Sequence, residues 1–280
     1  MDSKYLEKII DLALNEDIGD GDHTTLSTIP ENTQGKARLL VKQQGILCGV
    51  EVAKAVFKRF DPSLHMDVFI NDGAEIKPGD VAFTIEGKTV SILQTERLIL
   101  NFMQRLSGIA TQTQYYVKAL EGTGTKVLDT RKTTPGLRLL EKYAVKTGGG
   151  ENHRIGLYDM ILIKDNHIDF AGSATKAILN CKEYLKTKGK NLKIECEART
   201  FAEIEEILAV GVDRILIDNF SPEETKKAVQ IIGTKAETES SGGITIENMR
   251  KYAEAGVNYI SVGALTHQIK SLDLSLKAVH

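Results

Sequence analysis

Short apolar runs recur through the second half of the chain, and each is followed at once by polar residues. The clearest is Val127-Leu128, which runs into the segment Asp-Thr-Arg-Lys-Thr-Thr-Pro-Gly at 129–136. Further apolar runs begin near residues 160, 192, 214, 238 and 259. Helix-like stretches separate them, at 173–187, 200–210, 222–232 and 247–255. This alternation, repeated about every 20–35 residues, predicts βαβ units and parallel strands that are buried on both faces.

The polar ends of these runs favour an α/β barrel, in which the active site lies at the C-terminal face of the strands. A doubly wound open sheet is the competing architecture, but no Gly-x-Gly-x-x-Gly follows an early strand. The last two runs end in Ser241-Gly242-Gly243 and in Gly263-Ala264, with His267 close behind. Loops after the final two barrel strands often bind phosphate. Plain turn glycines are the alternative interpretation.

The first hundred residues show a different pattern, typical of an α+β domain. Strands are predicted at 37–41, 45–49, 65–70 and 81–85, and helices at 3–15 and 51–60. A long helix is predicted over 91–121, broken or bent near Gly108. Its buried stripe should contain Ile92, Leu93, Ile99, Leu100, Met103, Leu106 and Ile109. The sequence thus predicts an N-terminal domain over 1–109 and a barrel over 110–280, whose C-terminal tail packs on the N-terminal domain.

Composition excludes several classes of protein. The net charge of −2 gives no basic field for nucleic acid. The three cysteines, Cys48, Cys181 and Cys196, form neither a disulfide framework nor a metal-ligand spacing. No apolar run has the length of a membrane span, and the first residues do not resemble a signal peptide. We therefore expect a cytoplasmic protein that binds neither nucleic acid nor membrane.

Polar residues at the ends of the predicted strands suggest a binding site. Glu197 and Asp218 end consecutive strands, so we expect them to be neighbours. Paired carboxylates can hold Mg²⁺ through water, bind ribose hydroxyls or stabilise a cationic transition state. A structural salt bridge with Lys164 or Lys132 is the alternative. The opposing cations are Arg131, Lys132, His153, Arg154 and Lys164. Together the two sets predict a substrate with several negative charges and a sugar.

The sequence resembles quinolinate phosphoribosyltransferase, also called carboxylating nicotinate-nucleotide pyrophosphorylase, from about residue 5 to residue 276. Seven segments carry the resemblance, in order: Asp-Thr-Arg-Lys-Thr-Thr-Pro-Gly (129–136), Gly-Gly-Gly-Glu-Asn-His-Arg (148–154), Leu-Ile-Lys-Asp-Asn-His (162–167), Glu-Cys-Glu (195–197), Ile-Asp-Asn-Phe (217–220), Glu-Ser-Ser-Gly-Gly-Ile (239–244) and Val-Gly-Ala-Leu-Thr-His (262–267). The segment 16–22 and the helical stretch 101–111 are similar as well.

The resemblance implies an N-terminal α/β sandwich and an open α/β barrel. It also implies a head-to-tail homodimer with shared active sites, and such dimers could assemble further into a hexamer. It implies transfer of phosphoribosyl from 5-phosphoribosyl 1-pyrophosphate to quinolinate with Mg²⁺, giving nicotinate mononucleotide, pyrophosphate and CO₂ on the de novo route to NAD. The catalytic residues would be Lys132, Glu197 and Asp218, the two carboxylates also serving Mg²⁺. Substrate would further contact Arg105 (from the neighbouring subunit), Thr130, Arg131, Thr133, His153, Arg154, Lys164, Ser241, Gly242, Gly243, Gly263, Ala264 and His267.

Two rival functions are open at this point. A related phosphoribosyltransferase-like protein with another acid substrate would share the fold, although the intact set of cations argues against it. A carrier module of the biotinyl or lipoyl type would explain the turns at 71–73 and 77–80. Its modified lysine should lie in a Met-Lys-Met or Asp-Lys-Ala triplet, and neither triplet is present.

Overall fold

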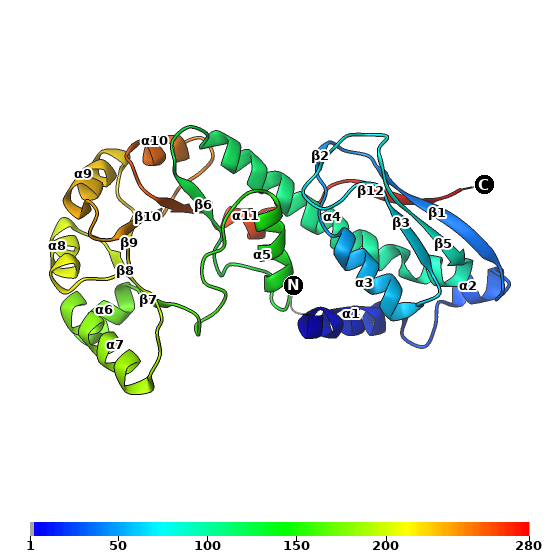
Figure 1. Ribbon diagram of the computed structural model, residues 1–280, viewed down its shortest axis with the longest axis horizontal. Helices are drawn as coiled ribbons and strands as arrows, with labels where there is room; N and C mark the ends of the chain where they lie inside the picture. The colour runs from blue at the N-terminus through cyan, green and yellow to red at the C-terminus, as the bar shows by residue number, and fades with distance from the viewer. Residues whose placement is uncertain (1–2, 280) are drawn as a thin grey trace. The chain divides into compact units, whose positions relative to one another are not determined.

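The structure is a computed structural model that describes residues 3–279. The chain forms two compact units, which are taken here one at a time (Figure 1). The first, here the antiparallel unit, comprises the chain up to Gln114, the segment Thr133–Gly149 and the chain from Ala264 onward. The second, here the parallel unit, comprises Tyr115–Lys132 and Gly150–Gly263. The barrel predicted over 110–280 thus gives two of its segments to the antiparallel unit.

A four-stranded antiparallel sheet forms the core of the antiparallel unit. Its strand order is β12-β1-β5-β3, with β1 at Gln34–Val41, β3 at His65–Val68, β5 at Val81–Lys88 and β12 at Leu274–Ala278. Alternate residues of β1 are buried, as expected for a sheet with one face against the core. Phe83 of β5 packs edge-to-face on Phe57 at 6.2 Å between ring centroids. The C-terminal strand β12 pairs with β1, so the end of the chain completes this sheet.

Six helices and a small β-ladder complete the antiparallel unit. Helix α3 buries Val50, Ala53, Val56 and Phe57 along one stripe, as its amphipathic sequence predicts. The elements are α1 (Ser3–Ile18), α2 (His23–Thr28), α3 (Val50–Phe60), α5 (Arg138–Thr147), α11 (Ala264–His267), the ladder of β2 (Gly45–Ile46) and β4 (Glu75–Ile76), and the greater part of α4 (Thr89–Ala119). The strand predicted at 45–49 is therefore only two residues long.

The long helix α4 corrects two predictions. It is continuous through Gly108, where the sequence predicted a break or a bend. Glycine is present because a Cβ there would lie 2.3 Å from the carbonyl oxygen of Lys270, so it permits a close approach of two backbones. The predicted buried stripe is confirmed except for Leu93, which is 39% exposed. None of the helices within residues 3–279 is long and apolar enough to cross a membrane.

The parallel unit is the expected α/β structure, an open parallel sheet. Its strand order is β6-β11-β10-β9-β8-β7, all pairs are parallel, and β6 and β7 are the two edges. Figure 1 shows the sheet curved, with its helices along the convex side. The strands are β6 (Lys126–Leu128), β7 (Ile161–Ile163), β8 (Ile194–Ala198), β9 (Arg214–Asp218), β10 (Glu237–Ser241) and β11 (Tyr259–Ser261). The helices are α6 (Asp165–Ala171), α7 (Ala174–Lys188), α8 (Phe201–Val210), α9 (Pro222–Ile232) and α10 (Met249–Glu254).

Several boundaries in the parallel unit differ from the prediction. Strand β8 begins at Ile194, two residues after the start of the predicted apolar run, and Glu195 and Glu197 lie within it. Helix α6, which was not predicted, begins at Asp165, and the ring of His167 accepts a hydrogen bond from the main-chain N–H of Lys164 at 3.0 Å. In the antiparallel unit, helix α5 was missed, because its short apolar pattern lies between glycine-containing segments.

Candidate active site

Polar side chains gather where the strands of the parallel unit end. Arg131 and Lys132 follow β6, Lys164 follows β7, and Asp218 and Ser241 are the last residues of β9 and β10. A cavity of about 310 Å³ opens at this edge of the sheet. Its lining consists of Thr130, Arg131, Lys132, His153, Arg154, Leu162, Lys164, Leu216, Glu239, Ser241 and Ser261. The cavity therefore unites all five cations that the sequence singled out.

The two arginines of this cavity differ in exposure, Arg131 being exposed and Arg154 partly buried. Burial lowers the pKa of Arg154, and the neighbouring charge of Arg131 lowers it further. Its Nη1 donates to the main-chain oxygen of Met160 at 3.3 Å. Two neighbouring guanidinium groups that repel one another favour an anion, because a bound carboxylate relieves the repulsion and accepts bidentate hydrogen bonds.

The carboxylates Glu197 and Asp218 lie on adjacent strands, as predicted. Glu197 in β8 is paired in register with Leu216 in β9, two residues before Asp218. Burial raises the pKa of Glu197, and the charge of Asp218 raises it further. Burial also raises the pKa of Asp218. Lys164 Nζ lies 3.8 Å from Glu197 Oε2, so the salt bridge considered as the structural alternative is present. A cation bound near Glu197 and Asp218 would stabilise their ionised forms, which burial disfavours.

The loop after β10 has a backbone that requires glycine. Gly242 and Gly243 both have positive φ, and a Cβ on Gly242 would lie 2.1 Å from Asn219 Oδ1. The main-chain N–H of Asn219 donates to Ser241 at 2.9 Å, which ties this loop to the end of β9. Backbone groups uncovered by side chains are what a bound phosphate needs. The loop geometry therefore requires glycine at 242, and the phosphate role of this loop stays a prediction.

Four predicted site residues belong to the antiparallel unit: Arg105, Thr133, Ala264 and His267. Arg105 is the best defined of them, with Nη2 at 2.6 Å from Glu141 Oε1 and 2.7 Å from Thr134 Oγ1. Glu141 is fully buried, and its other oxygen accepts the main-chain N–H of Thr134 at 3.1 Å. Arg105 is thus held in place by a buried carboxylate while 30% of its side chain is exposed.

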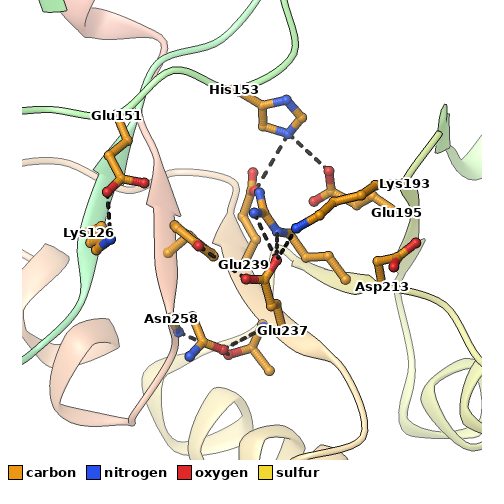
Figure 2. A network of polar contacts seen from close by, with 12 residues as sticks. Lys126, Glu151, His153, Lys193, Glu195, Asp213, Glu237, Glu239 and Asn258 are labelled. Carbon is orange, nitrogen blue, oxygen red and sulfur yellow. Dashed lines mark hydrogen bonds and ion pairs between the residues drawn. The ribbon is translucent and has the colours of Figure 1, made fainter. Parts of the chain in front are cut away.

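A buried network beneath the cavity was not predicted from the sequence (Figure 2). Its centre is His153, whose Nε2 lies 3.0 Å from Glu195 Oε2 and 3.5 Å from Glu239 Oε2. Arg214 contacts Glu239 at 3.0 Å and Glu237 at 3.1 Å, and its guanidinium lies 4.0 Å from the centre of the Tyr259 ring. The sequence feature that could have revealed this network was an acidic residue inside an otherwise buried strand, Glu195 in β8 and Glu239 in β10.

The acidic members of this network are poor acids. Burial raises the pKa of Glu195 to about 7, against the opposing charge of Arg214. Burial and the charge of Glu195 raise the pKa of Glu239 to about 7. Within residues 3–279, His153, Glu195 and Glu239 are the one group of three metal-ligand side chains in mutual reach, with atoms within 4.8 Å. Since Arg214 already neutralises this group, we interpret it as an ion-pair network.

Comparison with known protein families identifies the chain. The model of the quinolinate phosphoribosyl transferase N-terminal domain matches residues 22–107, and that of the C-terminal domain matches residues 109–277. The chain belongs to the quinolinate phosphoribosyltransferase family. The match across 22–107 also leaves the carrier-module interpretation of the turns at 71–80 without support.

Relatives of this family are similar over almost the whole chain. Quinolinate phosphoribosyltransferase [decarboxylating] 1b of Nicotiana tabacum is 44% identical over 97% of this chain and 82% of its own length. The probable nicotinate-nucleotide pyrophosphorylase [carboxylating] of Bacillus subtilis is 42% identical over 99% of this chain and 94% of its own. The crystal structure of NadC from Streptococcus pyogenes superposes with a TM-score of 0.94 at 39% identity, covering 100% of this chain and 99% of that one.

Proposed function

We infer that the protein transfers the phosphoribosyl group of 5-phosphoribosyl 1-pyrophosphate to quinolinate. The ring nitrogen forms a bond to the ribose, pyrophosphate leaves, and loss of CO₂ gives nicotinate mononucleotide for NAD biosynthesis. The observation that carries this inference is a cavity lined by five cationic side chains, with Glu197 and Asp218 on the adjacent strands β8 and β9, in a member of this family.

The cations of the cavity would bind the acid substrate. Quinolinate has two carboxylates, and we propose that Arg131 and Arg154 pair with them while His153 lies beneath. Lys132 and Lys164 would meet phosphate and pyrophosphate oxygens, where a flexible ammonium can follow the changing geometry. Thr130 and Thr133 add hydroxyl donors on the same segment of chain. Once the ring nitrogen is ribosylated, its positive charge stabilises the carbanion that the departing CO₂ leaves on the ring.

Glu197 and Asp218 would act on the ribose side. They are suited to Mg²⁺, because their pKa values are raised by burial and, for Glu197, by the other carboxylate, and hard cations prefer such oxygens. When bound, Mg²⁺ would neutralise the pyrophosphate leaving group. The two carboxylates would also stabilise the positive charge that develops on the ribose. We propose that Ser241, Gly242, Gly243 and Gly263 hold the 5′-phosphate. The phosphate roles of Ala264 and His267, which belong to the antiparallel unit, stay predictions from the resemblance.

The deciding experiment measures pyrophosphate and CO₂ release with quinolinate as the sole acceptor. We expect both products in equal amounts, with nicotinate in place of quinolinate giving neither. Release of pyrophosphate with nicotinate and not with quinolinate would assign the protein to another acid substrate. The same assay after removal of divalent cations with a chelator, followed by return of Mg²⁺, tests the proposed metal.

We propose in addition that two copies of the chain share each active site. Arg105 would reach the quinolinate pocket of the neighbouring subunit, held by Glu141 as described. Mixing the inactive variants Arg105→Ala and Lys132→Ala under conditions of subunit exchange tests this. Random pairing gives one intact site in each mixed dimer, so about a quarter of wild-type activity should return. No recovery despite proven exchange would leave Arg105 with a structural role.

A further inference from the structure

Both ring nitrogens of His153 already have partners beneath the cavity. The main-chain N–H of Arg154 lies 2.7 Å from Nδ1. A main-chain N–H can only donate, so Nδ1 is an acceptor and the ring proton is on Nε2. Nε2 lies 3.0 Å from Glu195 Oε2 and 3.5 Å from Glu239 Oε2, on the edge of the ring that faces the two carboxyls (Figure 2). This edge of the ring is therefore occupied by the two carboxyls.

The main chain around His153 connects the two loops that carry the cavity arginines. The main-chain N–H of His153 donates to Asp129 Oδ1 at 2.8 Å, and Asp129 is fully buried. Asp129 in turn donates its main-chain N–H to Glu151 at 3.1 Å. Arg131 follows Asp129 by two residues, and Arg154 follows His153 directly. The spacing of the two guanidinium groups therefore depends on where His153 is held.

The two carboxyls below His153 have few partners of their own. Glu195 is 0% exposed and Glu239 is 1% exposed. Both carboxyl oxygens of Glu195 and Oε1 of Glu239 have no hydrogen-bond partner among the described residues, so Glu195 Oε2 meets His153 Nε2 as a close polar contact at 3.0 Å. Such groups are costly to bury, so their retention in the middle of two strands calls for a role. Arg214 fixes Glu239 from below, and the His153 ring is the group that both carboxyls face from above.

We propose that Glu195 and Glu239 are positioning residues for quinolinate binding. They hold the ring of His153 from below, and the ring holds the main chain of Arg154 by its Nδ1. His153 thereby sets the distance between the two arginines that receive the carboxylates of the substrate. The proposal rests on the proposed function for its substrate, and on the contacts of the ring for its mechanism.

Paired substitutions at Glu195 separate a hydrogen-bond role from a general effect on folding. Glu195→Gln retains an oxygen that accepts from Nε2, whereas Glu195→Leu has a similar volume and no acceptor. We expect the dissociation constant for quinolinate to rise about tenfold in Glu195→Leu and to stay within about threefold in Glu195→Gln, the range of coupling between residues in contact. The KM for 5-phosphoribosyl 1-pyrophosphate should not change in either variant. Glu195→Met, also without an acceptor, replaces the leucine variant if that protein does not fold.

Glu237→Leu is the matched control. Glu237 is on β10, two residues before Glu239, and also contacts Arg214. The carboxyls that face the His153 ring are those of Glu195 and Glu239, and Glu237 is not among the residues that line the cavity. Its quinolinate affinity should remain at the wild-type value. In a His153→Ala background, Glu195→Leu should cause no further loss, because the ring through which it acts is gone. Equal losses in Glu237→Leu, or additive losses with His153→Ala, would overturn the proposal.

A measurement without substrate tests the ring itself. Long-range ¹H–¹⁵N spectra of histidine-labelled protein should show His153 with its proton on Nε2 in the wild type and in Glu195→Gln. Glu195→Leu should show a mixture of the two neutral forms. A wild type with its proton on Nδ1 would overturn the positioning mechanism. A wild type with the Nε2 proton that binds no quinolinate would instead contradict the proposed function, so the two failures are distinguishable.

Discussion

The interiors of the two sheets differ in kind. In the antiparallel unit, the buried positions of β1 and β5 are Leu39, Val41, Phe83 and Ile85, all 0% exposed. In the parallel unit, the middle of β8 and of β10 buries Glu195 and Glu239 almost as completely. The inward positions of parallel α/β barrels are ordinarily filled by Val, Ile and Leu. The strands of the antiparallel sheet thus bury apolar side chains at these positions, whereas the strands of the parallel sheet bury two carboxyls.

The parallel unit keeps its apolar burial on the other face of the same strands. Cys196, Ala198, Ile215 and Ile217 alternate with the charged residues and are all 0% exposed. Because side chains on a strand alternate between the two faces, one short strand can serve the helix layer and the site together. The comparison teaches that stability and chemistry are separated here by strand face. Substitutions on the two kinds of face should therefore have separable effects.

Phe83→Ala should have the largest effect, and on stability alone. Truncating a fully buried phenylalanine costs about 3–5 kcal/mol, through lost transfer free energy and the cavity left behind. Urea unfolding should show this loss, while quinolinate affinity of the folded protein stays unchanged. A loss below about 1 kcal/mol would mean that the antiparallel core repacks, and would weaken the contrast between the two interiors.

Glu197→Ala and Asp218→Ala should reduce turnover with little loss of quinolinate affinity. Removing a group that stabilises charge in the transition state costs about 100-fold in kcat, or about 2.7 kcal/mol. Steady-state kinetics and calorimetric binding of quinolinate give the two numbers. Thermal stability should hold or rise, because each variant removes a buried charge. Weak acid binding with normal turnover would contradict the ribose-side role.

Arg131→Ala and Arg154→Ala should show the opposite pattern. Each leaves one carboxylate of quinolinate without its partner, which costs about 2 kcal/mol or more in binding, or about thirtyfold. Calorimetry with quinolinate measures the loss. The matched control is Arg199→Ala, since Arg199 pairs with Asp169 and Glu203 outside the cavity. Unchanged affinity in both cavity variants would remove these arginines from the acid site.

The smallest effect concerns pH. The pKa of Glu239 is raised from its ordinary value near 4.5 to about 7, so the folded state holds this proton more tightly than the unfolded state. That contribution to stability is complete below about pH 4.5 and is lost as the pH rises through about 7. The melting temperature of the wild type should fall between pH 6 and pH 8, by roughly 2–4 °C for each kcal/mol of unfolding free energy that is lost.

Glu239→Gln should reduce this pH dependence, because the amide does not titrate. Glu237→Gln serves as the control, since the pKa of Glu237 is lowered, with Arg214 outweighing the effect of burial. An equal fall in melting temperature in the wild type and in Glu239→Gln would mean that the buried carboxyl does not hold the proton.

The sequence predicted the two kinds of sheet and the cavity residues, because strand ends and glycine loops leave a local signal. Helix α9 was predicted to the residue at 222–232, where Ser221 and Glu224 form a capping box. The sequence predicted that the C-terminal tail packs on the N-terminal domain, but it could not reveal that 133–149 joins the first unit, because such contacts are long-range. The role of Gly108 was missed for the same reason, since Lys270 is its partner. The cytoplasmic location stays a prediction.

The buried network shows a different limit of sequence interpretation. Glu195 and Glu239 were visible as acids in buried strands, but their partner His153 is on a loop far along the chain. Only the three-dimensional structure shows which ring nitrogen faces which carboxyl. The sequence placed His153 among the substrate-binding cations, and the structure adds that Nε2 of its ring faces the carboxyls of Glu195 and Glu239.

The pairing of β1 with β12 has a consequence for how the chain is made. Ala37 of β1 pairs with Ala278 of β12, so this pairing cannot form until the last strand has been synthesised. At about 5–20 residues per second, a ribosome would need on the order of ten seconds or more to make the intervening chain. During that time β1 has β5 on one side and an open edge on the other. The parallel unit lies between β1 and β12 in the sequence. Most of it therefore leaves the ribosome before β12 and can fold before the antiparallel sheet is complete.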